Sequence, residues 1–381
     1  MISGALKIPF VDLSWQHQPL EVEIKQAIQQ VIDRGDFVQG KALSEFETAF
    51  AEACNVQYGV GVACGTDAIA LGLQACGISQ GDEVIVPTNT FIATIIGIIR
   101  AGAVPVLVDC ILDTAGIDLS AAETVITPQT KAILPVHLYG QMISPQQLLD
   151  FAQIHNLIIF EDAAQAHLAQ RDGYRAGSIG LASSFSFYPS KNLGGMGNGG
   201  MVVTDNQSIA EKLRNLRNYG TSRQYLHTEY GTNSRLDTLQ AAVLNVKLPY
   251  LSRWNLERNQ AAQLYDQYLK PLRVQGIIPL ENHSGVGHIY HLYIVCLGAR
   301  LASKREKIQQ KLSEQGIQTG IHYPIPCHLQ PAYKFLGYKE GDFPNAESLS
   351  KQILSLPMYP GLAKKQVAFV SEQLLSVVSK L

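Results

Sequence analysis

The sequence lacks an excess of charge of either sign. Its 381 residues include 30 Lys and Arg against 32 Asp and Glu, which gives a formal net charge of −2. A protein that binds nucleic acid through the phosphates needs a basic face, so we expect no nucleic-acid partner. The six cysteines include no CxxC pair and mostly lie in apolar stretches, which favours buried thiols over a disulfide framework.

Long hydrophobic runs are missing as well. No run approaches the roughly 18 apolar residues of a membrane span, and the apolar stretch near the N-terminus is too short for a signal peptide. We therefore expect a cytoplasmic protein with no membrane partner. The sequence also has no internal repeat, heptad array or low-complexity tail, which excludes a solenoid or a coiled-coil scaffold. An enzyme becomes the leading class.

What the sequence does contain is an alternation of short apolar runs and amphipathic helical stretches over its first two thirds. This alternation predicts parallel strands joined by crossover helices, that is, a doubly wound α/β domain. The strands are expected to begin near Glu83, Val104, Lys131 and Leu157. After Pro249 a new set of elements follows, with a helix over 251–269, strands in HIYHLYIVCL and GIQTGIHY, and a helix over 303–315 between them. We predict two domains, residues 1–248 and 249–381.

Two segments carry chemistry. The strand LIIFEDAAQAH ends in Glu161 and Asp162, and ligands of such sheets bind at the carboxyl ends of strands. Buried carboxylates need a cation, a metal or solvent, although an exposed acidic strand end is an equally common arrangement. Lys191 lies in a loop of Ser, Pro and Gly; alone it would be a surface charge, but among apolar groups a lysine becomes a nucleophile for carbonyls.

Asp162 and Lys191 together suggest pyridoxal phosphate, whose aldehyde needs an amine and whose ring nitrogen needs an anion. In ACGTDAI, Gly65 and Thr66 are predicted to begin a helix whose free amides and dipole suit a phosphate, and Ser186 is a further candidate for binding the phosphate. Phe91 is the candidate for stacking on the ring. Each residue alone could be an ordinary helix start or core residue, and the prediction depends on their joint occurrence in this order.

Two other motifs are less convincing. The glycines of 195–200 satisfy GxGxxG, but a strand rather than a helix follows them, so we interpret them as a tight turn that holds Lys191 and not as a nicotinamide site. His288 and His291 form HxxH on an alternating apolar run, where strand packing is favoured over zinc, and we expect no metal.

Several polar residues could face a hydroxyl-rich ligand or could be simple surface groups. His137 and Tyr139 end a buried strand. His322, Tyr323 and His328 lie on the proline-stiffened loop GIHYPIPCHLQPAY. The polar stretch 219–233, which contains Tyr230, is predicted to be a functional surface loop.

Over nearly its whole length the chain resembles the DegT/DnrJ-type nucleotide-sugar aminotransferases of the aspartate-aminotransferase (fold-type I) superfamily. The resemblance is carried, in order, by IPFVDL, ACGTDAI, GDEVIVPTNTFIAT, PVHLYGQ, EDAAQAH, SFYPSKNLGGMGNGGMVVT, GTNSRLDTLQAAVLNVKL and YPIPCHLQPAY. It implies a large domain with a mixed, mostly parallel seven-stranded sheet between helices, and a smaller C-terminal α/β domain.

The resemblance also implies roles for individual residues. Lys191 would bind pyridoxal phosphate covalently, Asp162 would pair with the pyridine nitrogen, and Gln165 would lie near the ring hydroxyl. The positions of Phe91, Gly65, Thr66 and Ser186 match the stacking and phosphate-binding residues. Asn233 would reach the phosphate of a neighbouring subunit, which implies a homodimer with shared sites. Members that dehydrate their substrate carry histidine in place of this lysine, so Lys191 favours amino transfer. The family often has aspartate at Asn198 and alanine at Gly195, which leaves the electrostatics of the turn open.

The implied reaction moves an amino group from glutamate to a nucleotide-linked keto-sugar for polysaccharide or natural-product glycosylation. The motifs look most like enzymes that aminate the 3-position of dTDP-keto-sugars, such as dTDP-3-keto-6-deoxyhexoses, with UDP-linked 3-keto uronates and 4-keto-sugars as alternatives. The nucleotide, whether dTDP, UDP or GDP, stays open, and Tyr230, His322 and His328 are candidates for contacting it or the sugar. Two rivals remain: a non-catalytic regulatory protein, and a pyridoxal-dependent lyase or decarboxylase of amino acids.

Overall fold

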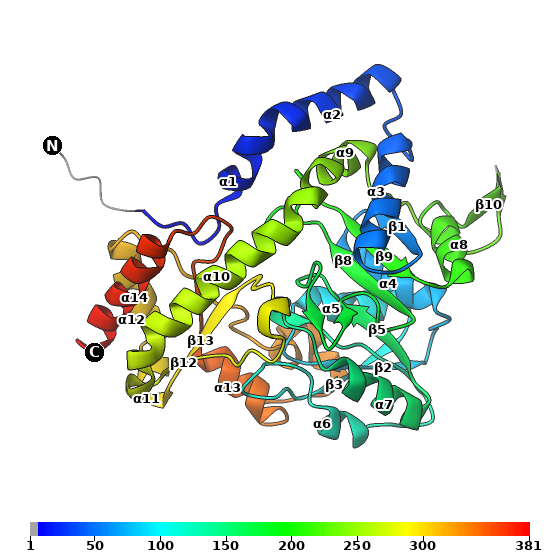
Figure 1. The fold of residues 1–381 in the computed structure, drawn as a ribbon. Helices are drawn as coiled ribbons and strands as arrows, with labels where there is room; N and C mark the ends of the chain where they lie inside the picture. The colour runs from blue at the N-terminus through cyan, green and yellow to red at the C-terminus, as the bar shows by residue number, and fades with distance from the viewer. Residues whose placement is uncertain (1–6, 224) are drawn as a thin grey trace.

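The computed structural model describes residues 7–223 and 225–381 (Figure 1). Residues 1–6, and with them the start of the stretch that was compared with a signal peptide, lie outside the described residues. Within the described part of the chain, no helix combines the length and apolar character that a membrane crossing needs.

A seven-stranded sheet forms the centre of the larger part of the molecule. Its strands run in the order β1-β9-β8-β5-β4-β2-β3, and only β9 is antiparallel to its neighbours. The sheet is therefore mixed and mostly parallel, as expected. Its strands are β1 (Tyr58–Val62), β2 (Glu83–Pro87), β3 (Val104–Val108), β4 (Thr130–Ile133), β5 (Ile158–Asp162), β8 (Ala182–Ser186) and β9 (Gly200–Thr204).

Both faces of this sheet are buried, which explains why its strands are apolar without alternation. Successive residues of one strand belong to different cores: Val84 and Val86 pack on one face, and Ile85 packs on the other. The first face is covered by α4 (Gly65–Ala75), α5 (Ile92–Arg100) and α8 (Gln207–Leu216). The second is covered by α3 (Lys41–Ala53), α7 (Pro145–His155) and α9 (Thr238–Lys247).

A second, smaller sheet of three antiparallel strands lies in the C-terminal third, in the order β12-β13-β14. The long helix α10 (Leu251–Leu269), whose bounds match the predicted range, runs between this part and α9 (Figure 1). The remaining elements of this part are β12 (Ile277–Pro279), β13 (Tyr293–Leu297), β14 (Ile353–Leu356), α11 (Ala299–Ala302), α12 (Arg305–Glu314), α13 (Pro344–Gln352) and α14 (Lys364–Val378).

The start of the described chain packs against this C-terminal part. Ile8 forms a parallel bridge with Ile317, and the backbone N–H of Phe10 donates to Oε1 of Gln318 at 3.0 Å. The helices α1 (Leu13–His17) and α2 (Glu21–Arg34) then lead back to α3. A division into residues 1–248 and 249–381 stays a proposal. It assigns the two sheets to different domains, but the N-terminal residues Ile8 and Phe10 then contact the domain to which they are not assigned.

Three local predictions need correction. GIQTGIHY forms no strand and makes only the single bridges of Ile317 and Gly320. In HIYHLYIVCL only the second half is a strand, β13. The stretch 219–233, predicted to be a loop, contains the short hairpin of β10 (Thr221–Arg223) and β11 (Leu226–His227), while residue 224 lies outside the described residues. This hairpin projects from the body of the molecule beside α8 (Figure 1).

Candidate active site

Asp162 ends β5 at the carboxyl edge of the central sheet. Its Oδ2 accepts a hydrogen bond from the hydroxyl of Thr94 at 2.8 Å, and its Oδ1 accepts one from the backbone N–H of Ala164 at 3.1 Å. Burial raises the pKa of the Asp162 carboxyl above its ordinary value, and the bonds from Ala164 and Thr94 and the nearby Lys191 oppose that rise. The carboxylate is thus oriented by fixed donors before any ligand binds.

Lys191 lies in the connection between β8 and β9. β8 is the neighbour of β5 in the sheet, and Asp162 pairs with Ser184 of β8. The connecting segment is held as a compact turn, because the N–H of Lys191 donates to the carbonyl of Tyr188 and the N–H of Gly195 to the carbonyl of Phe187, both at 2.9 Å. Burial lowers the pKa of the Lys191 amine to about 8, and Asp162 opposes this effect. The amine is therefore closer to its neutral, nucleophilic form than an exposed lysine.

A cradle for an anion lies at the N-terminus of α4. Gly65 is the first residue of this 11-residue helix, so the free amides of its first turn and its dipole point toward the end of β8. A Cβ atom added to Gly65 would lie 2.7 Å from Cβ of Ser186, so only glycine permits this close approach. The hydroxyls of Thr66 and Ser186 border the same space.

These features surround one cavity of about 400 Å³, which is within the range of small-molecule sites, roughly 300–1,000 Å³. Every predicted cofactor residue except Asn233 lines it, together with two of the predicted substrate residues: Gly65, Thr66, Phe91, Asp162, Gln165, Ser186, Lys191, His322 and Tyr323. Segments that are more than a hundred residues apart in the sequence are therefore brought to one site.

The cavity fits pyridoxal phosphate. The helix start offers amides and hydroxyls for a phosphate, Lys191 offers an amine for the aldehyde, and Asp162 offers a carboxylate for the ring nitrogen. Half of the Phe91 side chain is exposed, and its ring lies 5.4 Å from that of Tyr323, so it is free to pack on a planar ligand. Gln165 is held by the N–H of Tyr139 and donates to the hydroxyl of Tyr323 at 3.0 Å.

Three predicted substrate residues are placed elsewhere and need correction. The ring of His137 is fully buried: its Nδ1 accepts from the N–H of Ile143, and its Nε2 bonds to Glu161 at 2.9 Å, so no nitrogen is left for a ligand. His328 is likewise held on both ring nitrogens, by Thr88 and Glu347. The hydroxyl of Tyr139 donates to the carbonyl of His322, so this side chain supports the cavity wall without lining it.

Two further predicted residues lie away from the cavity of their own chain. Tyr230 is fully exposed at the base of the projecting hairpin, and Asn233 is exposed where the hairpin returns to the body of the molecule. Neither lines the cavity described above.

The sequence interpretation missed several residues of the cavity. Thr94 lies in the first turn of α5, three residues after its N-cap Phe91, so the nearness of the two residues in the sequence could have marked it. His291, which we assigned to strand packing, lies before β13 and lines the cavity. Nothing in the local pattern distinguishes Cys64, Thr90 or Asn198, which also line it.

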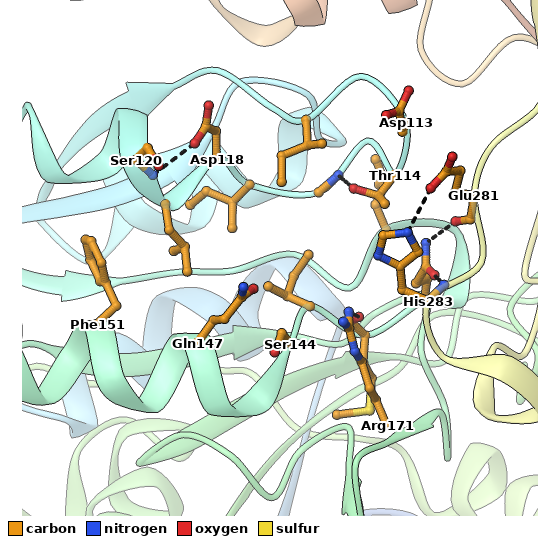
Figure 2. Close-up of a pocket in the computed structure, with 18 of the residues that line it drawn as sticks. Asp113, Thr114, Asp118, Ser120, Ser144, Gln147, Phe151, Arg171, Glu281 and His283 are labelled. Atoms are coloured by element: carbon orange, nitrogen blue, oxygen red, sulfur yellow. Dashed lines mark hydrogen bonds and ion pairs between the residues drawn. The ribbon is translucent and has the colours of Figure 1, made fainter.

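A second cavity, of about 480 Å³, shares no lining residue with the first (Figure 2). It is bounded by the loop after β3, the start of α7 and the segment that carries Glu281 and His283. His283 bonds to Glu281 at 2.9 Å, and Arg171 donates to the carbonyl of Met142 at 3.1 Å. No lysine lines this cavity, so it cannot provide the amine that the chemistry above requires.

A mixed sheet with an aspartate at the end of one strand, a lysine in the loop after the neighbouring strand and a helix that begins with glycine against the end of that neighbouring strand defines a pyridoxal-phosphate enzyme of the aminotransferase class. The comparisons agree. Residues 18–375 match the model of the DegT/DnrJ/EryC1/StrS aminotransferase family. The chain belongs to that family, and it is an aminotransferase that uses pyridoxal phosphate.

Three curated relatives illustrate the range of names in this family. The chain is 43% identical over 360 residues to "dTDP-3-amino-3,4,6-trideoxy-alpha-D-glucose transaminase" of Streptomyces venezuelae, covering 94% of this chain and 93% of the relative. It is 42% identical over 364 residues, covering 96% of each, to "UDP-N-acetyl-3-dehydro-alpha-D-glucosamine 3-aminotranferase" of Acidithiobacillus ferrooxidans. It is also 42% identical over 369 residues to a "Pleiotropic regulatory protein" of Geobacillus stearothermophilus, covering 97% and 98%.

Among solved structures, the fold is similar to the crystal structure of S. venezuelae DesV in complex with a ketimine intermediate. The TM-score is 0.93 at 41% sequence identity, and the match covers 98% of this chain and 99% of that one. The similarity therefore extends over both sheets.

Proposed function

We propose that this chain transfers an amino group from glutamate to a nucleotide-linked keto-sugar, with a dTDP-3-keto-6-deoxyhexose as the substrate. The class of reaction follows from the family. The 3-position and the dTDP nucleotide are supported by the name of the S. venezuelae relative. The product would be an amino sugar for polysaccharide or natural-product glycosylation.

The observation that carries this proposal is the shared cavity of Lys191 and Asp162. Pyridoxal phosphate, when bound there, supplies an aldehyde for amines and a ring that withdraws electrons. Asp162 would hold a proton on the ring nitrogen, since Thr94 and Ala164 already orient both of its oxygens. The Lys191 amine would move a proton from the carbon that bears the donor's amino group to the carbon of the cofactor's aldehyde, and in the second half it would move a proton in the reverse direction, onto the carbon of the sugar ketone.

The remaining cavity residues would hold the ligands. Gly65, Thr66 and Ser186 would bind the phosphate, Phe91 would stack on the ring, and Gln165 would contact its hydroxyl. His322 and Tyr323, which come from the C-terminal part of the chain, would face the sugar.

A homodimer in the cytoplasm is part of the proposal. Asn233 and Tyr230 are exposed and lie outside the cavity of their own chain, as residues that serve a second copy would. We assign Asn233 to the phosphate and Tyr230 to the sugar nucleotide of the partner.

One further substrate has a specific observation in its favour. The name of the A. ferrooxidans relative supports a UDP-linked 3-keto-sugar as the alternative acceptor. A purely regulatory role is disfavoured because this chain keeps Lys191 in a cavity that fits the cofactor. An amino-acid lyase would share Lys191 and Asp162, but it would need no keto-sugar.

The experiment is to mix the purified protein with glutamate and a panel of dTDP- and UDP-linked keto-sugars and to measure 2-oxoglutarate. We expect turnover that depends on a dTDP-3-keto-sugar and that is lost in Lys191→Ala. Turnover with the UDP-sugar alone supports the alternative acceptor. Release of product from amino acids without any keto-sugar contradicts the proposal.

A further inference from the structure

The residue after Lys191 is bonded to parts of the chain far from its own loop. Asn192 is fully buried, and its Nδ2 donates to Oδ1 of Asn255 at 2.9 Å and to the carbonyl of Ile289 at 3.1 Å. Its Oδ1 lies 3.1 Å from Nδ1 of His291. Asn255 belongs to α10, and the other two partners precede β13. The loop that carries the lysine is thus bonded to the C-terminal part of the chain.

These bonds determine which nitrogen of His291 carries the hydrogen. A carbonyl oxygen can only accept, so the Asn192 atom that faces Ile289 is the amide nitrogen. The other Asn192 atom is therefore the oxygen, which also can only accept, and Nδ1 of His291 must donate to it. Burial keeps the ring neutral by lowering the pKa of His291 well below its ordinary value, and Lys191 and Arg258 add to this effect. Nε2 of the neutral ring then has a free lone pair.

His291 lines the same cavity as Lys191, and its Nε2 receives no hydrogen bond from any residue that the structure describes. The other histidines near Lys191 differ. His167 uses Nε2 to donate to the carbonyl of Ser186 and does not line the cavity. His322 bonds through Nδ1 to the Ser355 hydroxyl, which can donate or accept and so fixes no tautomer.

We propose that His291 is a positioning residue for Lys191: its unprotonated Nε2 is the acceptor to which the Lys191 amine turns when it is released from the cofactor and protonated, a bond that the side chain does not make in the conformation of this structure, and Asn192 sets the tautomer that makes this possible. The role of His291 in turnover rests on the proposed function, whereas the tautomer of His291 rests only on the hydrogen bonds described above. When the carboxylate of Asp162 is bonded to the cofactor's ring nitrogen, the Lys191 amine that has been released from the cofactor needs another hydrogen-bond acceptor. A neutral imidazole orients the amine without the second carboxylate charge that would make it strongly basic.

Two substitutions at His291 separate its two nitrogens. In His291→Asn, the shorter amide replaces Nδ1 and keeps the bond to Asn192, but nothing replaces Nε2. In His291→Gln, the longer amide places an oxygen at the position of Nε2 and loses the bond to Asn192. A structural role alone predicts that the asparagine variant is the milder change. The proposal predicts the reverse.

The readout is the pH dependence of acetic anhydride labelling of Lys191 in protein freed of cofactor, followed by peptide mass spectrometry. Loss of an acceptor for the ammonium form should lower the pKa of Lys191 by about one pH unit in His291→Asn, and His291→Gln should restore most of it. Lys247 is the internal control, because it too is buried with a pKa lowered to about 8, but it donates to the carbonyl of Gly194. An unchanged Lys191 pKa in His291→Asn, or an equal change in both variants, overturns the proposal.

A second measurement uses the unsubstituted chain and does not depend on the stability of a variant. Long-range proton–nitrogen NMR of ¹⁵N-histidine-labelled, cofactor-free protein reports the tautomer of each ring, and the His291 signal is the one that His291→Gln removes. We expect a neutral ring protonated at Nδ1. A ring protonated at Nε2, or an imidazolium, overturns the proposal.

Turnover provides the link to the proposed function. His291→Asn should lower kcat about tenfold in both half-reactions with little change in KM for the keto-sugar. The labelling involves no sugar, so a shifted Lys191 pKa in a protein that aminates no keto-sugar would refute the proposed substrate and leave this inference standing. Turnover of the keto-sugar together with an unshifted Lys191 pKa in His291→Asn would refute this inference and leave the proposed function standing.

Discussion

The hydroxyl of Thr94, at the start of α5, donates to Oδ2 of Asp162, at the end of β5, over 2.8 Å. Thr94 in turn lies 2.8 Å from the hydroxyl of Thr90, which must donate to it because the hydrogen of Thr94 is already used. The carboxylate that we propose for the cofactor's ring nitrogen is therefore oriented by a chain of two hydroxyls that begins beside the predicted stacking residue Phe91.

Removing this hydroxyl should weaken cofactor binding. Thr94→Val keeps the shape of the side chain but leaves one oxygen of a buried carboxylate without its donor, which costs about 1.5–3 kcal/mol. We expect the dissociation constant of pyridoxal phosphate, followed by absorbance titration, to rise at least tenfold. Thr124→Val, at an exposed threonine that bonds only to the carbonyl of Ala121, is the control and should change nothing. An unaltered dissociation constant in Thr94→Val would contradict the role of Asp162.

Gly65 provides a test of the phosphate cradle. In Gly65→Ala the new Cβ would lie 2.7 Å from Cβ of Ser186, so the helix start and the strand end must move apart. We expect a lower Tm and a large loss of cofactor affinity. Adding Ser186→Gly removes the clashing atom and should recover the Tm but not the affinity, since the hydroxyl is then missing. Equal recovery of both would argue against a phosphate site at this position.

The buried amine of Lys191 should make the stability of the cofactor-free protein depend on pH. Its pKa is lowered from 10.5 to about 8, so between those pH values the unfolded chain binds more protons than the folded one. The free energy of unfolding contributed by this group therefore rises with pH through that window and is at its lowest below pH 8. Lys191→Met should be more stable than the unsubstituted protein at pH 7 in urea unfolding.

This advantage should shrink as the pH rises from 8 toward 10.5. Lys131→Met, at an exposed lysine, is the matched control and should show no such trend. If Lys191→Met were no more stable than the unsubstituted protein at pH 7, Lys191 would not be a buried amine.

The shared site can be tested with mixed dimers. In a hybrid of a Lys191→Ala chain and an Asn233→Ala chain, one site combines the intact lysine of one copy with the intact asparagine of the other. The Lys191→Ala preparation should lack turnover, and the Asn233→Ala preparation should lack high-affinity cofactor binding. We expect both properties to reappear when the two preparations are mixed. Failure of hybrids to recover, with dimers shown by light scattering, would place Asn233 outside the partner's site.

The positions of the central strands, which are buried on both faces of the sheet, were predicted best from the sequence. The beginnings of β2, β3, β4 and β5 were placed within one residue, because strands covered on both faces are apolar throughout and stand out from their surroundings. That Asp162 and Lys191 share a cavity could be predicted because Asp162 ends β5 and Lys191 follows the neighbouring strand β8, and the ends of neighbouring parallel strands meet at one edge of the sheet.

Hydrogen bonds between segments that are distant in the sequence could not be predicted from it. His137 was expected at a ligand, but Glu161 holds it, and the same carboxylate also accepts N–H groups of Gly177, Ile179 and Gly180. Nothing near His137 in the sequence reveals that partner. GIQTGIHY has the composition of a strand, but it leaves the sheet after a single bridge at Gly320, and His322 thereby reaches the cavity.

The most direct test of the account is to reduce the cofactor-loaded protein with borohydride, digest it and map the modified peptide by mass spectrometry. The account predicts that one lysine, Lys191, carries the reduced cofactor, and that prior addition of glutamate prevents this labelling because the cofactor has then accepted the amino group. Attachment at another lysine, such as the buried Lys247, or labelling that glutamate does not prevent, would contradict it.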